Sequence, residues 1–512
     1  MELKVTRQGV SIEEALFDQT VEQSLDTDFT LPDYCPDISR ILKCRVVPKI
    51  AGKTVSGNAV NLDGVLSVTV LYADNENAVR AYEHPVAFTK SLDMGVALTG
   101  TGFVTVQARP ETINCRPVSE RKVDVHGAVS LQIRVTHKCT AEVVADIDGG
   151  NIQMLRGTCP ATSPMGGCEK YLIINDEMDL PDDFEPVRYN LRSDAMAVAT
   201  ECKIISNKAV IKGDMAVSVL YCGDETGSPQ RFSSTLPVSQ IVDIDGIAEG
   251  CNCAVDIDVV SLELKPRTGI SGEARSFTLA AKLCMTVKAT CDNDIAVIYD
   301  AYSTDYKEKF EKKDIVFEKL IAPLRQQLTC KKTLEFMPDE LGTLIDVWCD
   351  TMVSGVTCDD RELTLTGTTL ICVLARDMQD LPVYFERPVD FDYHYRLDTA
   401  PRQMRSATIV RATGATGTLT GNGMLEVKVE LTLSVDVFDM VKQPVVTAFE
   451  IDQESMKEKL TAAALVIYYA DEGERVWDIA RHYNTRVDEV MSLNALTEET
   501  LSGSKMLMIP NV

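Results

Sequence analysis

A cysteine between two aspartates is the most chemically suggestive stretch of this 512-residue chain. In LPDYCPDISRIL, which runs from Leu31 to Leu42, Asp33 and Asp37 flank Cys35. Glycan hydrolysis uses two carboxylates held at a set separation, and a thiol nucleophile needs a nearby base. An aspartate that follows proline, however, is typical of a turn in which the carboxylate caps its own backbone. We therefore interpret both aspartates as turn residues.

Two weaker copies of this stretch support the interpretation. Leu180-Pro181-Asp182 and Met337-Pro338-Asp339 keep the Pro-Asp pair but lose the cysteine. Proline lacks an amide proton, fixes φ and pushes the preceding residue toward extended geometry. Each copy therefore predicts a strand that runs into a tight corner. A catalytic thiol would not be expected to vanish while the corner survives.

Other catalytic and metal-binding patterns are not found in the sequence. It contains no phosphate-binding loop, and its five histidines lie in no local catalytic motif. The closest cysteine pair, Cys251 and Cys253, has no neighbouring histidine to complete a zinc site. The 77 acidic residues offer many carboxylate pairs, none of them specific. We expect no enzymatic activity, no cofactor and no metal.

Glycine-led strands follow the corners at a constant distance. Residues 64–72 (GVLSVTVLY) match residues 213–221 (GDMAVSVLY), and residues 367–375 form a looser third copy. The first two copies are 149 residues apart, measured either at the glycine or at the corner proline. A period near 150 residues is the size of a whole domain. The sequence therefore predicts a domain that occurs three times.

Alternating apolar and polar side chains indicate the type of domain. Residues 123–135 and 424–438 alternate strictly, which predicts strands with one buried face, and Gly421-Asn422-Gly423 predicts a hairpin turn. We interpret residues 148–168 as a linker, 300–319 as a charged connector that faces solvent, and 454–464 as a short helix. The predicted fold is mainly β: three tandem antiparallel β-sandwich or barrel-like domains (1–150, 165–305 and 310–445), followed by a small α+β (βααβ) module at 464–512.

Charge and composition restrict the function classes. A net charge of −26 argues against binding to nucleic acid or to anionic membranes and fits a protein with a basic partner. The sequence shows no signal-peptide pattern and no apolar run of membrane-spanning length. We therefore expect a cytoplasmic protein whose 16 cysteines are mostly reduced, buried thiols.

The last fifty residues predict strand, helix, helix and strand at 466–469, 476–483, 487–494 and 505–510. This region resembles the LysM module in four stretches: GERVWDIA from Gly473, YNT from Tyr483, LN from Leu493 and LSGSK from Leu501. LysM modules usually bind N-acetylglucosamine polymers in a groove between two loops. The resemblance implies a groove lined by Gly473, Glu474, Arg475, Val476, Asn494, Ala495 and Leu496.

This module departs from the LysM pattern in two ways. The family usually carries Gly-Asp-Thr-Leu at the first loop, where this chain has Gly-Glu-Arg-Val, so two long charged side chains replace small ones. The module also has eight acidic against four basic side chains. Both departures favour a protein partner over a sugar.

The repeated units resemble the SPOCS domain family of spore-coat proteins, through LPDYCPDI, the glycine-led strands and DAYST at Asp300–Thr304. Several such units before one LysM module resemble the SpoIVA-interacting coat morphogenetic proteins of endospore-forming bacteria. The resemblance implies a scaffold in the mother-cell cytoplasm, at the forespore surface, with the coat ATPase SpoIVA as partner. The alternative is a peptidoglycan-binding protein targeted through LysM. No set of catalytic residues in the sequence supports a third possibility, a cell-wall hydrolase.

Overall fold

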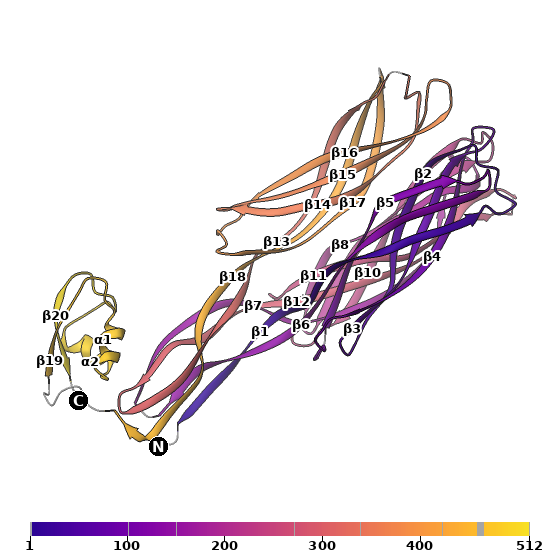
Figure 1. The fold of residues 1–512 in the computed structure, drawn as a ribbon. Coiled ribbons are helices and arrows are strands. Elements are labelled where there is room, and N and C mark those ends of the chain that lie inside the picture. Colours follow the sequence, from indigo (N-terminus) through magenta and orange to yellow (C-terminus); the bar gives the residue numbers. More distant parts are fainter. Residues whose placement is uncertain are drawn as a thin grey trace.

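The computed structural model describes residues 3–100, 102–149, 151–270, 272–337, 339–421, 423–457 and 465–510. The chain is mainly β, as predicted: the described strands form antiparallel sheets, and the two helices lie near the C-terminus. Among the described residues, no helix is long and apolar enough to cross a membrane. Figure 1 shows an elongated molecule with sandwiches at one end and the helical module at the other.

The first repeat consists of two three-stranded sheets, ordered β1-β6-β5 and β2-β3-β4. Their buried faces enclose one apolar core, in which Val129, Leu131, Ile133 and Val135 alternate as predicted. The strands are β1 (Lys4–Thr30), β2 (Arg40–Ser56), β3 (Ala59–Ala73), β4 (Val79–Asp93), β5 (Gly102–Pro117) and β6 (Lys122–Asp148).

The second and third repeats have the same topology, with sheets β11-β12-β7 and β10-β9-β8, then β13-β18-β17 and β14-β15-β16. Each encloses its own core. The strands of the second repeat are β7 (Ile152–Asp179), β8 (Val187–Ile205), β9 (Lys208–Gly223), β10 (Pro229–Asp243), β11 (Asn252–Thr268) and β12 (Ala274–Ser303). Those of the third are β13 (Tyr306–Glu335), β14 (Thr343–Asp359), β15 (Glu362–Arg376), β16 (Pro382–Arg396), β17 (Met404–Gly421) and β18 (Met424–Met456).

The predicted corners are confirmed, but they lie between the first and second strands of each repeat and not at its start. Backbone hydrogen bonds of 2.9 Å from Cys35 N to Pro32 O and 3.0 Å from Phe184 N to Pro181 O close the first two turns. The third is closed at 3.0 Å between Glu340 N and Met337 O, while Pro338 lies outside the described residues. Gly421 and Gly423 have the positive φ expected of the hairpin turn, and Asn422 also lies outside the described residues.

Three long ribbons leave the sandwiches and pack together into a stalk (Figure 1). We define the stalk as residues 4–15 and 136–148 (β1/β6), 152–164 and 290–303 (β7/β12), and 306–320 and 438–456 (β13/β18). A register shift occurs in each ribbon where it leaves its sandwich, and such bulges bend and twist a strand pair. Two apolar clusters along the stalk take side chains from all three ribbons.

The stalk contradicts three interpretations of the sequence. Residues 148–168 are not a linker, because β7 begins at Ile152 and continues to Asp179. Residues 300–319 are not a connector, because they are the facing ends of β12 and β13; most of their lysines and glutamates are exposed, as expected, but Asp300 is buried. The predicted helix at 454–464 is wrong for its first residues, which belong to β18, while residues 458–464 lie outside the described part of the chain.

The three sandwiches meet at a shared junction. Leu71, Leu220 and Leu374, each seven residues after the repeated glycine, pack into one cluster with Trp348. Beside this cluster, Arg192 of the second repeat and the fully buried Asp346 carboxylate of the third form an ion pair of 2.6 Å. The junction therefore holds equivalent surfaces of the three repeats together.

One cysteine pair is an exception to the expected reduced thiols. Cys251 and Cys291 form a disulfide, with Cα atoms 4.4 Å apart. They flank the antiparallel pair Asn252 and Thr290, so the register of β11 and β12 brings their side chains face to face. The other fourteen cysteines are free.

The C-terminal module has the predicted element order. It contains β19 (Leu465–Ala470), α1 (Val476–His482), α2 (Val487–Leu493) and β20 (Lys505–Pro510), with β19 and β20 paired antiparallel. Its core includes Val476, Ile479, Val490, Leu507 and Ile509. The helices are short because Asn484, with φ of 50°, ends α1, and Ala495, also at 50°, follows α2.

Candidate partner-binding surface of the C-terminal module

The first four predicted groove residues form one edge of the module. Gly473 N donates to Leu501 O at 2.8 Å, and Leu501 N donates to Glu474 O at 3.0 Å. Val476 N donates to Glu499 O at 2.8 Å, and its side chain is fully buried. These bonds fix the loop before α1 to the segment before β20. The Val476 side chain packs in the core of the module.

The two long charged side chains of this loop differ in availability. The Glu474 carboxylate accepts hydrogen bonds from Tyr468 Oη at 3.0 Å and from Asp471 N at 3.0 Å. The first of these bonds raises the pKa of Tyr468. Arg475 pairs with Asp478, and both side chains are more than half exposed. Glu474 therefore stabilises the loop, while Arg475 remains accessible to a partner.

The other three predicted groove residues lie after α2 and have mainly structural contacts. Asn494 Nδ2 donates to Val490 O at 2.8 Å and to Met508 O at 2.7 Å, while its Oδ1 accepts from Met508 N at 2.7 Å. Leu496 packs against the module core, and Ala495 is exposed. Among the described residues, no hydrogen bond joins this set to residues 473–476. The structure therefore does not assemble the seven residues into one polar site.

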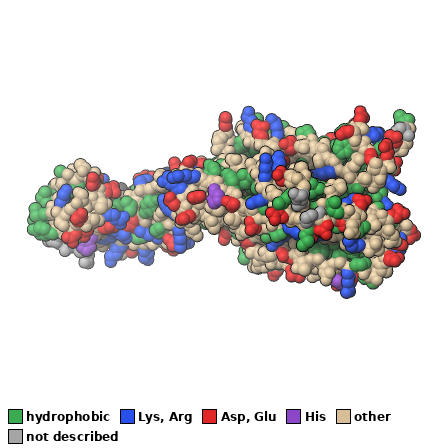
Figure 2. All heavy atoms as spheres, turned by 90° about the horizontal axis from the view of Figure 1, so that it is seen from above, with side chains coloured by type: hydrophobic (Ala, Val, Ile, Leu, Met, Phe, Trp, Pro, Cys, Tyr) green, Lys and Arg blue, Asp and Glu red, His purple; other side chains and the backbone are tan. Residues whose placement is uncertain are grey.

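The outer face of the two-stranded sheet is an apolar surface that the groove prediction missed. Ile467 and Met508 are cross-strand partners, 56% and 37% exposed, and Tyr469 is 77% exposed opposite Met506. Figure 2 shows hydrophobic side chains gathered at this end of the molecule. LVIYYA is apolar throughout, so the sequence did not show which residues face outward; in the structure its second, fourth and sixth residues point inward. We call this surface the apolar face; it consists of Leu465, Ile467, Tyr469, Met506 and Met508.

The opposite side of the module is held by the tip of the stalk. Trp477 Nε1 donates to Asp300 Oδ2 at 3.0 Å, and Arg481 Nη1 binds the same oxygen at 2.6 Å. Lys312 Nζ of β13 lies 3.0 Å from the other carboxylate oxygen. One buried carboxylate of β12 therefore joins α1 to two ribbons of the stalk.

Competing effects determine the ionisation of Asp300. Burial by itself raises its pKa, because the charged form loses its hydration. Hydrogen bonds from Trp477 and Lys312, together with the charge of Arg481, outweigh burial and hold the pKa of Asp300 below its ordinary value. The carboxylate is therefore charged at neutral pH and keeps its three partners.

A second contact completes the docking of the module. The buried Tyr302 hydroxyl donates to Thr485 O at 2.8 Å, and the Tyr302 and Trp477 rings meet edge to face with centroids 5.1 Å apart. Burial is the main cause of the raised pKa of Tyr302. This side of α1 is therefore covered, whereas the apolar face and Arg475 remain exposed.

Comparison with protein families gives a match in the first two sandwiches. Residues 37–118 and 187–266 match the family model described as SipL, SPOCS domain. The chain therefore contains two segments that match the SPOCS domain. The matched segments cover β2–β5 of the first repeat and β8–β11 of the second, and each lies between the two strands of a ribbon. No curated protein and no solved structure matches the chain. The resemblance of the module to LysM stays a prediction.

Proposed function

We propose that this chain is a non-enzymatic scaffold of spore-coat assembly, which docks a basement-layer ATPase of the SpoIVA type through its LysM-like module. The two SPOCS matches support a role in sporulation. The proposal places the protein in the mother-cell cytoplasm, at the forespore surface.

The observation that carries the docking role is the apolar face. Five large apolar side chains share one side of a two-stranded sheet, directed away from the stalk. Contiguous exposed apolar surface is uncommon on soluble proteins and marks interaction sites. Acidic residues in the adjoining loop, Asp471 and Glu472, are exposed and favour a partner with a basic rim around an apolar centre.

The arrangement of the chain suits a scaffold. The stalk separates the module from the sandwiches, so that a partner held by the apolar face leaves the SPOCS domains free for other contacts (Figure 1). The net charge of −26 favours basic partners over nucleic acid or anionic lipid.

Capture of the purified ATPase by the full chain tests the proposal. Ile467→Asp with Met508→Asp places two charges at the centre of the apolar face and should weaken capture at least about 100-fold, the loss typical of interface hot spots. Ile173→Asp is the matched control, because Ile173 is 74% exposed on β7, far along the sequence from the module. Arg475→Gln tests the adjoining loop.

Two results would contradict the proposal. Capture that survives the double substitution would remove the apolar face as the docking surface. Tight binding to purified peptidoglycan without ATPase capture would instead favour the glycan-binding alternative.

A further inference from the structure

The third sandwich differs from the other two at its open edge. In every repeat, the two sheets approach closely along β2/β5, β8/β11 or β14/β17 and are separated along the opposite edge. In the first repeat, Lys90 of β4 bridges that edge to Glu22 O of β1, and in the second Lys170 bridges to Ile241 O at 3.2 Å. Among the described residues, no hydrogen bond joins β13 to β16 in the third.

Two core positions behind this edge carry smaller side chains in the third repeat. Two residues after the repeated glycine, the first and second repeats have Leu66 and Met215, both fully buried, and the third has Thr369. Threonine is shorter than either and carries a hydroxyl. The third sandwich therefore has less apolar volume at this point.

The second position is defined by a backbone hydrogen bond that occurs in all three repeats. Leu31, Leu180 and Phe336 each donate a backbone hydrogen bond to the start of the paired strand, and they thereby mark equivalent positions. Six residues before them stand the apolar Leu25 and Ile174, and in the third repeat the smaller Cys330.

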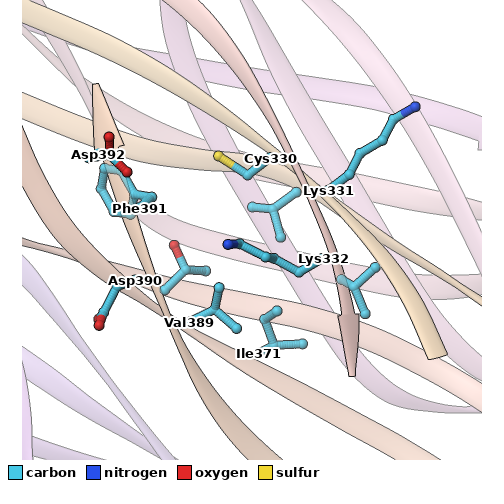
Figure 3. Close-up of a pocket in the computed structure, with 11 residues that line it drawn as sticks. Cys330, Lys331, Lys332, Ile371, Val389, Asp390, Phe391 and Asp392 are labelled. Atoms are coloured by element: carbon cyan, nitrogen blue, oxygen red, sulfur yellow. The ribbon is translucent and has the colours of Figure 1, made fainter. Parts of the chain in front are cut away.

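These two replacements line a cavity of about 160 Å³ that opens between β13 and β16. Figure 3 shows Cys330 and Lys332 on one side and Val389, Asp390 and Phe391 on the other. Ile371, Val427 and Val429 complete the apolar wall. A closed apolar cavity of about 150 Å³ holds a benzene molecule, so this one suits a single ring or a short branched chain.

The mouth of the cavity offers an unused positive charge. Asp390 accepts a hydrogen bond from Thr368 at 2.8 Å, and Asp392 from His394 at 2.8 Å. Lys331 and Lys332, in contrast, have no carboxylate within 4.0 Å among the described residues. Figure 3 shows Lys332 extending across the mouth and Lys331 directed away. Burial raises the pKa of the Cys330 thiol, which keeps it a neutral wall rather than a nucleophile.

We propose that this cavity binds a small carboxylic acid with an apolar body, of the size of benzoate. The body fills the space beside Thr369 and Cys330, and the carboxylate lies at the mouth against Lys332. The site is independent of partner docking by the C-terminal module and lies in a different domain.

Calorimetric titration of the full chain with benzoate, and with benzyl alcohol as the uncharged analogue, tests the proposal. We expect saturable benzoate binding that Thr369→Leu abolishes by filling the cavity as Leu66 does in the first repeat. Cys330→Leu fills the same space from β13 and should act alike. Lys332→Gln should weaken benzoate binding at least about tenfold, the loss expected for a charge-assisted contact, without changing benzyl alcohol binding.

Lys331→Gln is the matched control, because it removes the neighbouring charge that is directed away from the cavity. Thermal melting of each variant reports whether the sandwich still folds. Three results would overturn the proposal: no benzoate binding to the unmodified chain, binding that survives both filled-cavity variants, or equal affinity for benzyl alcohol. Lys332 is exposed, so its variant decides the question even where a core variant misfolds.

Discussion

Trp477 of the C-terminal module donates its indole hydrogen bond to Asp300 of the stalk at 3.0 Å, across 177 residues of sequence. The same carboxylate oxygen binds Arg481. Together with the Tyr302 contact, this acidic side chain holds the module in its orientation and so sets the direction of its apolar face.

Asp300→Asn should release the module from the stalk. The amide keeps the volume but leaves Arg481 and Lys312 without their anion, a loss of about 2–5 kcal/mol in docking free energy for a buried charge pair. Trp477 fluorescence in a Trp348→Phe background should shift to longer wavelength, and small-angle scattering should show a more variable particle. The control is Asp314→Asn, whose pair with Lys442 is more than half exposed on both sides. An unshifted Trp477 spectrum would show that the module is held by other contacts.

Acid should undock the module before it unfolds the sandwiches. The pKa of Asp300 in the folded chain lies below its ordinary value of 3.8, so its contribution is complete above that value and is lost as pH falls through the lowered pKa. We expect the Trp477 signal to be flat from about pH 5 to pH 8 and to change below about pH 4. The Asp300→Asn chain should lack this transition; a transition at the same pH in that variant would assign it to another group.

Asp346→Asn should destabilise the junction between the second and third repeats. Its side chain is fully buried between Arg192 and Arg231, and removing one partner of a buried ion pair costs about 3–5 kcal/mol. Chemical denaturation should show this loss as a lower midpoint. Asp350→Asn is the nearby control, because that carboxylate is 58% exposed and 3.4 Å from Arg45, and it should change stability by less than about 0.5 kcal/mol. Equal effects of the two variants would contradict the assigned role of the buried pair.

Tyr72→Phe and Tyr221→Phe should have similar, additive effects. The two hydroxyls donate at 3.0 Å to Pro36 O and Glu185 O, two bonds that hold the corner in equivalent repeats. Pro36 is exposed and Glu185 is half-buried, so loss of each bond should cost about 0.5–1.5 kcal/mol, the net contribution of an ordinary hydrogen bond. Tyr34→Phe is the control, since Tyr34 is 81% exposed. Denaturant titration measures all three, and a neutral Tyr72→Phe would refute the role of this bond.

The sandwiches were predictable because their signals are local. Alternation in residues 123–135 and 424–438 reports a strand with one buried face, and the Pro-Asp corners and repeated glycines fix the period. The element order of the C-terminal module was predictable for the same reason. Each helix has its own local apolar pattern, and each is followed, one residue after its C-cap, by a residue with positive φ.

The stalk was missed because its glycines and prolines have a tertiary explanation. A Cβ at Gly157 would lie 2.3 Å from the Tyr299 ring, and just beyond the stalk, one at Gly167 would lie 2.3 Å from Val287 O. Pro160 and Pro164 are tolerated because β7 is an edge strand. Glycine here reports close approach of a neighbouring strand, which a single sequence cannot distinguish from a loop.

The candidate site was only partly predictable. The module and the exposed Arg475 follow from local motifs, but the covered side of α1 depends on Asp300 and Tyr302, which are remote in sequence. In sequence, Asp300 begins a charged segment, and nothing local shows that its charge is neutralised by a distant arginine.

The order in which the chain leaves the ribosome makes the stalk the last part of the repeats to form. Val10 of β1 packs in one cluster with Val445 of β18. This contact cannot form until β18, more than four hundred residues further along the chain, has been synthesised. Contacts at such separation close slowly, whereas each sandwich core is assembled within its own repeat. A truncated chain can therefore present finished sandwiches but no complete stalk, and so no complete seat for the module. Correct display of the apolar face thus requires that both β18 and the C-terminal module have been synthesised.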